Sequence, residues 1–206
     1  GDTNVLDSGY SSIGALFYIA PWVFMFLIPA ITMRLFSEES RTGTIELLLT
    51  KPLTDFQIVL AKYIAGFLLV LFSLLPTLVY FYSVYQLGAP IGNIDMGGTW
   101  GSYFGLLFLG SVFVSIGLFS SAISNNQIIS FIIGVFLCFF TYVGFESISS
   151  LQLFGAIDDV IINLGINAHY LSMSRGVIDT RDVIYFLGVI FLFLLFTKTV
   201  LGSRKW

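Results

Sequence analysis

Five long apolar windows limit this chain to one class of fold. They cover about residues 13–33, 63–87, 100–123, 128–145 and 183–201. A helix of about 20 apolar residues spans the hydrocarbon core of a bilayer. Inside lipid, every backbone polar group must find its hydrogen bond within the protein, which a helix provides. We therefore expect an all-α, polytopic membrane bundle, with five spans in a single transmembrane domain covering residues 1–206.

The composition agrees with a membrane environment. Hydrophobic residues make up 57% of the 206 residues and charged residues 10%, whereas a soluble domain carries about 25% charged residues. A soluble fold of this size could not bury so much apolar surface. Cys138 is the single cysteine and lies in an apolar run, which excludes a disulfide framework and a cysteine metal cluster.

The basic residues predict the orientation, because Lys and Arg accumulate in cytoplasmic loops. Seven of the nine basic residues fall between residues 34 and 62 or at the carboxyl end, and only Arg175 and Arg181 fall elsewhere. We expect the carboxyl end and residues 36–62 in the cytoplasm and the start of the chain outside. An external start without a signal peptide suggests a further span before Gly1, which would give six spans in the full-length protein.

The cytoplasmic connection, residues 36–62, is expected to contain two short helices that meet at a proline. The first covers about residues 43–50 and has Glu46 in its first turn, where the helix dipole favours a carboxylate. It ends before Pro52, because the residue ahead of a proline is disfavoured in helical geometry. We expect this short helix to lie near the inner membrane surface.

The second helix of the connection continues into the next span. Thr54 and Gln57 have the spacing of a capping box, so this helix is predicted to begin at Asp55. Pro76 lies well inside the same span. Because a proline removes one backbone hydrogen bond, we expect a kink there.

The external connection, residues 146–182, contains an amphipathic stretch at residues 151–164. Asp158 and Asp159 interrupt its apolar positions, and the stretch is too short and too charged to cross a membrane. We expect it to fold as one or two half-helices in the outer interface, because unpaired backbone is not tolerated there.

No motif of an enzyme active site is present. The sequence lacks a phosphate-binding loop, an H-E-x-x-H motif and a G-x-S-x-G elbow. His169, the only histidine, has no neighbouring carboxylate in the sequence and is interpreted as structural. No Asp, Glu, Arg or Lys lies in the middle third of a span, where ion-coupled carriers need an ionisable group. We expect no catalytic residue, metal or cofactor in this chain, and no nucleic-acid partner.

Small residues in the third window predict a close helix contact. Gly101 and Gly105, and likewise Ser111 and Ser115, are four residues apart and share a helix face. We interpret these four residues as helix-packing positions. The first window instead carries several large aromatics: Phe17, Tyr18, Trp22, Phe24 and Phe26. We interpret them as packing in the core or against lipid, with the lining of a substrate path as the alternative.

The strongest motif lies in the cytoplasmic connection. It contains an acidic residue, an arginine, the pattern Gly-Thr-x-Glu-x-Leu-Leu, a proline, and a lysine that opens the next span. These residues are Glu39, Arg41, Gly43, Thr44, Glu46, Pro52 and Lys62. Helix capping alone would explain Glu46 but not the whole combination.

This pattern resembles the permease subunits of type-2 ABC exporters, in which the loop forms a coupling helix that docks into the ATPase subunit. Residues 175–179, ahead of the last span, also look like the carboxyl-terminal pattern of that family. In general sequence character the chain is most similar to the gliding-motility-associated ABC transporter permeases of Bacteroidetes. The family's amino-terminal cytoplasmic helix and first span have no counterpart in this sequence.

The resemblance implies a transmembrane permease subunit in a bacterial inner membrane, with the seven motif residues coupling it to an ATPase. A separate cytoplasmic ABC ATPase would bind ATP and Mg and hydrolyse the ATP. A second permease copy or a related permease, together with membrane lipid, would complete the partners. Two alternatives remain open: a membrane scaffold of a cell-envelope complex without transport of its own and, less favoured, an intramembrane enzyme.

Overall fold

The computed structural model describes residues 13–45, 52–88, 90–150, 155 and 158–203. Within these ranges the regular structure is entirely helical. The elements are α2 (Gly14–Thr32), α3 (Arg34–Thr42), α5 (Asp55–Leu74), η1 (Leu75–Thr77), α6 (Leu78–Leu87), α7 (Met96–Ile123), α8 (Gln127–Phe139), η2 (Phe140–Gly144), α9 (Phe145–Ser150), α10 (Asp158–Leu164), α11 (Ile166–Ser174) and α12 (Thr180–Ser203).

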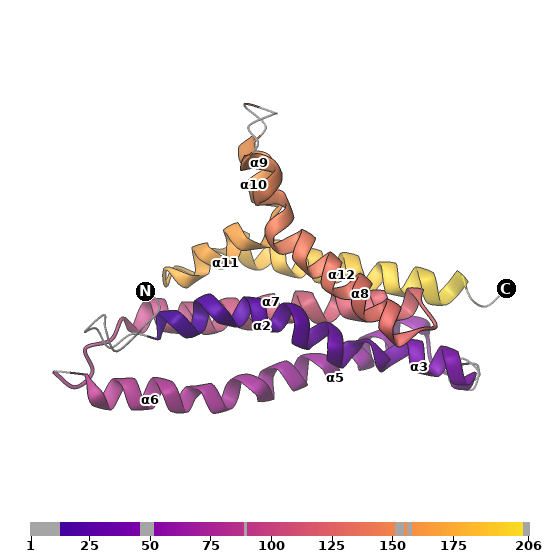
Figure 1. Cartoon of the computed structure of the whole chain (residues 1–206), viewed down its shortest axis with the longest axis horizontal. Helices are drawn as coiled ribbons and strands as arrows, with labels where there is room; N and C mark the ends of the chain where they lie inside the picture. Colours follow the sequence, from indigo (N-terminus) through magenta and orange to yellow (C-terminus); the bar gives the residue numbers. More distant parts are fainter. Residues whose placement is uncertain (1–12, 46–51, 89, 151–154, 156–157, 204–206) are drawn as a thin grey trace.

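Five of the helical stretches are long and apolar enough to cross a membrane, which confirms the predicted all-α polytopic bundle. They are Gly14–Thr42, Asp55–Leu87, Met96–Ile123, Gln127–Ser150 and Thr180–Ser203. Four of them run roughly along the long axis of the molecule and Gln127–Ser150 runs obliquely, with α3 and the carboxyl end of α12 at one end (Figure 1). We call this the α3 end.

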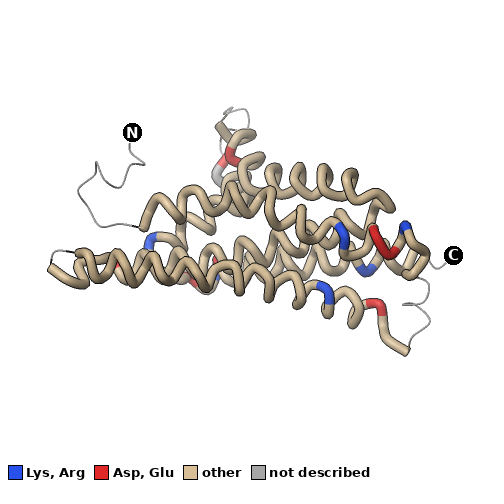
Figure 2. Tube along the Cα trace, turned by 60° about the horizontal axis from the view of Figure 1, so that its bottom comes forward, with Lys and Arg blue, Asp and Glu red and all other residues tan. Residues whose placement is uncertain are grey.

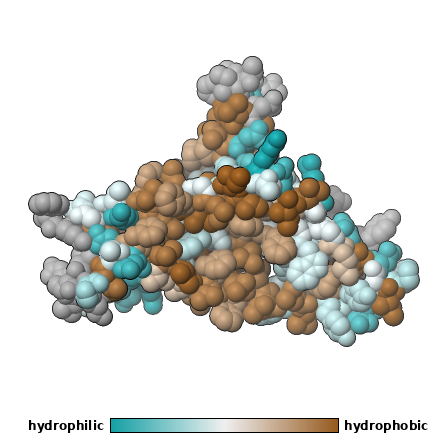
Figure 3. Space-filling view, turned by 180° about the vertical axis from the view of Figure 1, so that it is seen from behind, coloured by the Kyte–Doolittle hydropathy of each residue, from teal (hydrophilic) through white to brown (hydrophobic). Residues whose placement is uncertain are grey.

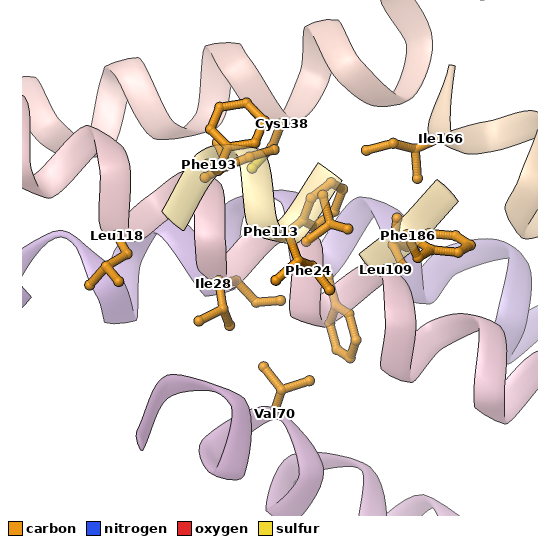
Figure 4. Packing of buried hydrophobic residues seen from close by; sticks show 14 of the residues in the cluster. Phe24, Ile28, Val70, Leu109, Phe113, Leu118, Cys138, Ile166, Phe186 and Phe193 are labelled. Atoms are coloured by element: carbon orange, nitrogen blue, oxygen red, sulfur yellow. The ribbon is translucent and has the colours of Figure 1, made fainter. Parts of the chain in front are cut away.

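Helix α7 is the centre of the bundle and packs against α2, α5, α8, α11 and α12. In its apolar window 78% of the residues are buried, against 28–33% in the other four spans. Figure 4 shows this core, in which Phe113 of α7 meets side chains from α2, such as Phe24, and from α8, such as Cys138. The other four spans therefore surround α7 and carry the outer surface of the bundle.

Glycines let neighbouring helices approach α7 closely. A Cβ atom at Gly110 would lie 2.6 Å from Val70 of α5, and one at Gly117 would lie 2.0 Å from the Thr32 hydroxyl of α2. Both distances are shorter than van der Waals contact, so side chains larger than hydrogen cannot be accommodated there without movement of the helices.

The surface has the pattern expected of a protein surrounded by lipid. On the face shown in Figure 3, brown, apolar side chains form a broad band across the middle of the molecule, and hydrophilic residues gather toward its ends. Described Lys, Arg, Asp and Glu residues are concentrated at the α3 end, with others at the opposite end and on the α9–α10 projection (Figure 2). A charged side chain in the middle of a bilayer is costly, which explains this distribution.

The predicted start of the second span's helix is confirmed. Helix α5 begins at Asp55, and its capping box is complete: the Gln57 backbone N–H donates to Thr54 Oγ1 (3.3 Å) and the Thr54 N–H donates to Gln57 Oε1 (2.9 Å). At Pro76 the helix tightens into the 3₁₀ turn η1 before α6 continues. Where a kink was expected, the structure therefore has a short change of helix type.

The prediction for residues 36–62 missed one helix. We expected the first short helix at about residues 43–50. The structure has a helix before that position, α3, which is capped at its carboxyl end by Gly43. The cause is that α2 does not end in a loop: after a bend at Met33 the chain continues directly into α3. Thr44 and Ile45 are helical again; the remainder of the predicted helix, with Glu46, lies outside the described residues.

Between α8 and α12 the described residues form the π-helix η2 and the short helices α9, α10 and α11. Helices α9 and α10 project sideways from the bundle (Figure 1). Helix α10 lies within the predicted amphipathic stretch, whereas residues 151–154, 156 and 157 of that stretch lie outside the described part of the chain. Helix α11 packs along α7, where Cβ atoms at Gly101 and Gly105 would lie 2.3 Å from the Met173 carbonyl oxygen and 3.1 Å from the Tyr170 ring.

Candidate functional site

The bend between α2 and α3 is held by a serine from another helix. The buried Ser121 of α7 accepts hydrogen bonds from the backbone N–H groups of Phe36 (2.9 Å) and Ser37 (3.1 Å). Its hydroxyl donates to the Met33 carbonyl oxygen at the bend (2.8 Å). The first N–H groups of a helix lack carbonyl partners within that helix. A capping side chain normally satisfies them, and here α7 supplies it.

A lysine ties α3 to α5 one turn further on. Lys62 Nζ lies 2.6 Å from Glu39 Oε1 and also donates a short hydrogen bond to the Leu35 carbonyl oxygen. The same ammonium group lies 4.6 Å from the centre of the Phe36 ring, within the range of a cation–π contact. The Lys62 side chain is 16% exposed and that of Glu39 32%, so water screens the pair only in part.

Only one of the two carboxylate oxygens of Glu39 takes part in this contact. Its second carboxylate oxygen, Oε2, is buried and has no hydrogen-bond partner among the described residues. A buried acceptor without a partner costs free energy. The ion pair with Lys62 keeps Glu39 in place despite this cost, because loss of one partner would leave the other charge partly buried and unpaired.

The tip of α3 is exposed. Gly43 ends the helix with a φ of 73°, in the left-handed region that favours glycine at this position. The Thr42 hydroxyl bonds back to the Glu38 carbonyl oxygen (2.9 Å) and lies 3.0 Å from the Thr44 hydroxyl. Arg41, in the last turn, is exposed and lies where the helix dipole favours a cation.

The structure thus separates the motif residues into two groups. Glu39 and Lys62 form the ion pair between α3 and α5, whereas Arg41, Gly43 and Thr44 form an exposed turn after it. Two further motif residues complete the set: Pro52, which is exposed shortly before α5, and Glu46, which lies outside the described residues. Docking of this turn to a partner stays a prediction.

The other pair of the small-residue motif lies deeper in α7. Ser111 and Ser115 are buried, and their hydroxyls donate within the helix, to the carbonyl oxygens of Leu107 (2.6 Å) and Val112 (2.7 Å). Unlike Ser121, these two serines therefore direct their hydroxyl hydrogens to their own helix.

A second polar cluster, which sequence reasoning missed, joins α10, α11 and α12. His169 Nδ1 lies 2.7 Å from Asp182 Oδ1, and Nε2 lies 2.9 Å from the Asn163 carbonyl oxygen. The imidazole also stacks on the Tyr185 ring, with 3.8 Å between centroids. His169 and Asp182 are 13 residues apart in different helices, so no local sequence signal could have paired them.

Tyr170 secures α11 on the opposite side, against α2. Its hydroxyl donates to the Phe17 carbonyl oxygen (2.8 Å). Burial, with a smaller contribution from nearby Tyr142, raises the pKa of Tyr170 well above its usual value, so the hydroxyl stays protonated and able to donate. Among the described residues, no three His, Cys, Asp or Glu side chains gather as metal ligands would.

Comparison with known proteins identifies the family. The family model described as "ABC-2 family transporter protein" matches residues 5–165, which is more than half of the chain and includes α2, α3, the 36–62 connection and α7. A search of curated proteins finds no match. The match covers both contacts that hold α3, to Ser121 and to Lys62. The chain therefore belongs to the ABC-2 transporter family, and it is a membrane permease subunit of an ABC transporter.

Proposed function

We propose that this permease exports a substrate with energy from a separate cytoplasmic ABC ATPase, which docks at the α3 end and binds ATP and Mg. One observation carries the proposal: α3 ends in an exposed turn, yet it is bonded at its base to α7 through Ser121 and to α5 through Lys62. The family itself implies an ABC ATPase as partner.

The contacts of α3 provide a route for movement. Helix α3 continues from α2, so a push on its exposed turn acts directly on that span. The Glu39–Lys62 pair passes the same displacement to the start of α5, and Ser121 passes it to α7. Because interiors are close-packed, such helices shift as bodies and do not deform continuously. In this proposal the shift changes the side of the membrane to which the substrate path opens.

The docking surface combines the described turn with the motif residues beyond it. Arg41 and Thr44 are exposed in the turn, and Glu46 is assigned to the surface from the sequence pattern. Charged groups can form strong hydrogen bonds with a partner when the interface excludes water. The basic residues at the α3 end support placing this end in the cytoplasm. The functional unit would contain two permeases, identical or related.

The resemblance to the gliding-motility-associated permeases supports a narrower proposal, in which the exporter serves the gliding machinery of a bacterial cell envelope. The other candidate function is a membrane scaffold of that machinery without transport. Both functions place the chain in the inner membrane with a partner at the α3 end, and they differ in whether ATP hydrolysis moves a substrate.

The test is recovery of the ATPase with purified permease. The variant Glu39→Ala/Glu46→Ala releases α3 from Lys62 and removes Glu46 from the docking surface. It should remain inserted in the membrane but recover on the order of tenfold less ATPase, since about 1.4 kcal/mol of binding free energy corresponds to tenfold in affinity. The single variant Glu38→Ala, which changes the neighbouring acid and leaves the Lys62 pair intact, is the control. Equal recovery for wild type and double variant would overturn the docking proposal. ATPase recovery without substrate transport would favour the scaffold.

A further inference from the structure

A cavity of about 460 Å³ lies between α2, α7, η2, α9 and α11, toward the end of the molecule opposite α3. This volume is within the range of about 300–1,000 Å³ that is typical of small-molecule sites. Residues on single helix faces form three of its walls. The wall residues that matter here are Tyr18 with Trp22, Tyr142 with Glu146, and Asn167 with Tyr170.

The spacing of these residues explains why they face the same space. Tyr18 and Trp22 are four residues apart on α2, so their side chains emerge from one face of the helix. On the opposite wall Tyr142 lies edge-on to Trp22, with 6.2 Å between the ring centroids. Trp22 is 41% exposed and Tyr18 69%, which leaves ring surface available to a ligand.

Tyr142 lies in a segment of unusual geometry. Residues Phe140–Gly144 form the π-helix η2 between α8 and α9. Such π-helical turns are rare and occur frequently at functional sites. Here the wider turn forms part of the cavity wall, which is a second observation, independent of the cavity volume, that points to a binding role.

The charge of the cavity is negative. Among the described residues that line it, Glu146 is the single acidic residue and none is basic, and the remainder are apolar, aromatic or neutral polar. Asn167 Nδ2 donates to Glu146 Oε2 (2.7 Å), which fixes the carboxylate and leaves its other oxygen available. Aromatic ring faces also carry negative electrostatic potential. Apolar walls with a negative potential favour an organic cation over a neutral or anionic ligand.

We propose that this cavity binds an organic cation with apolar substituents, of the quaternary ammonium or phosphonium class, and that this class is the substrate of the transporter; this second part rests on the function proposed above. The cation would lie against the Trp22 and Tyr18 rings and near the Glu146 carboxylate. The same chemistry is offered by a dissolved cation and by a choline lipid headgroup.

Binding of tetraphenylphosphonium to the purified full-length permease in phosphatidylglycerol nanodiscs tests the proposal. Triphenylphosphine oxide, which is neutral and of similar shape, is the comparison ligand. We expect the cation to bind on the order of tenfold more tightly than the neutral compound to wild type. Glu146→Gln should remove most of this difference, because it retains the shape and the Asn167 contact but loses the charge. Trp22→Leu should weaken binding of the cation by a similar factor.

Glu38→Gln, which removes a carboxylate at the α3 end, is the matched control and should bind the cation as wild type does. Equal affinity of wild type for both compounds, or unchanged cation binding by Glu146→Gln, would overturn the proposal. If phosphatidylcholine added to the nanodiscs competes with tetraphenylphosphonium, the natural ligand is a lipid headgroup. If it does not compete, the natural ligand is a dissolved cation. Because the assay contains no ATPase, its result is independent of ATPase docking.

Discussion

At the scale of single residues, Ser121 makes the contact on which the account of α3 depends. A serine hydroxyl has one hydrogen to donate and two lone pairs to accept, and Ser121 uses all three, with Met33 as acceptor and with Phe36 and Ser37 as donors. Because the site is buried, water cannot replace these bonds.

Ser121→Ala should therefore destabilise the bend between α2 and α3. Two backbone N–H groups would lose their side-chain acceptor, at a cost of about 1–3 kcal/mol for a buried group left unsatisfied. Thermal unfolding of the purified permease measures this cost. Ser120→Ala is the matched control, since the buried Ser120 hydroxyl donates only to the Gly117 carbonyl oxygen of its own helix (2.8 Å). An equal loss of stability in both variants would show that the hydrogen bonds of Ser121 to α3 do not stabilise the protein more than a hydrogen bond within α7 does.

The residue scale also shows what the sequence could and could not predict. Glu39 and Lys62 stand out because they belong to a compact motif. Ser121 has no such signal: its partners are 84–88 residues away in the sequence. The same holds for His169 and Asp182, which meet only because α11 and α12 pack together.

At the scale of elements, local sequence signals predicted the helices well, whereas the contacts between elements could not be predicted from the sequence. The five spans and the capping box at Thr54 depend on neighbouring residues, and both were predicted. At Pro76 a kink was predicted, and the structure has a change of helix type there. Helix α3 was missed because its polar sequence next to a span resembles a loop. It is held by tertiary contacts to Ser121 and Lys62, which composition and periodicity do not reveal.

Gly43 sets the end of α3, and its substitution should act through the backbone alone. A Cβ atom there would have no neighbour within 4 Å, so the effect arises from the φ of 73°. Gly43→Val should strain the turn by about 1–2 kcal/mol or more and lower ATPase recovery, whereas Gly43→Asn should be tolerated, because asparagine adopts this conformation readily. Pull-down of the ATPase with both variants is the measurement. Wild-type recovery with Gly43→Val would show that the turn geometry does not matter for docking.

At the scale of the whole molecule, the two ends of the bundle should face different compartments. The charge distribution predicts that the α3 end is cytoplasmic. In a variant without Cys138, a cysteine at Ile91, which is 68% exposed between α6 and α7, should react with an impermeant maleimide on intact cells. A cysteine at Thr44, exposed after α3, should react only after permeabilisation. The reverse pattern of labelling would invert the orientation.

In the proposed mechanism, ATPase movement reaches the spans through the base of α3. The most direct test of this mechanism is the distance between spin labels at Ile19 of α2 and Val79 of α6, both exposed far from α3, measured by pulsed electron paramagnetic resonance with and without trapped nucleotide. The complex is compared with Ser121→Ala and Ser120→Ala variants. We expect nucleotide trapping to change this distance in wild type and in Ser120→Ala, and to change it much less in Ser121→Ala. The same change in all three complexes would contradict this mechanism.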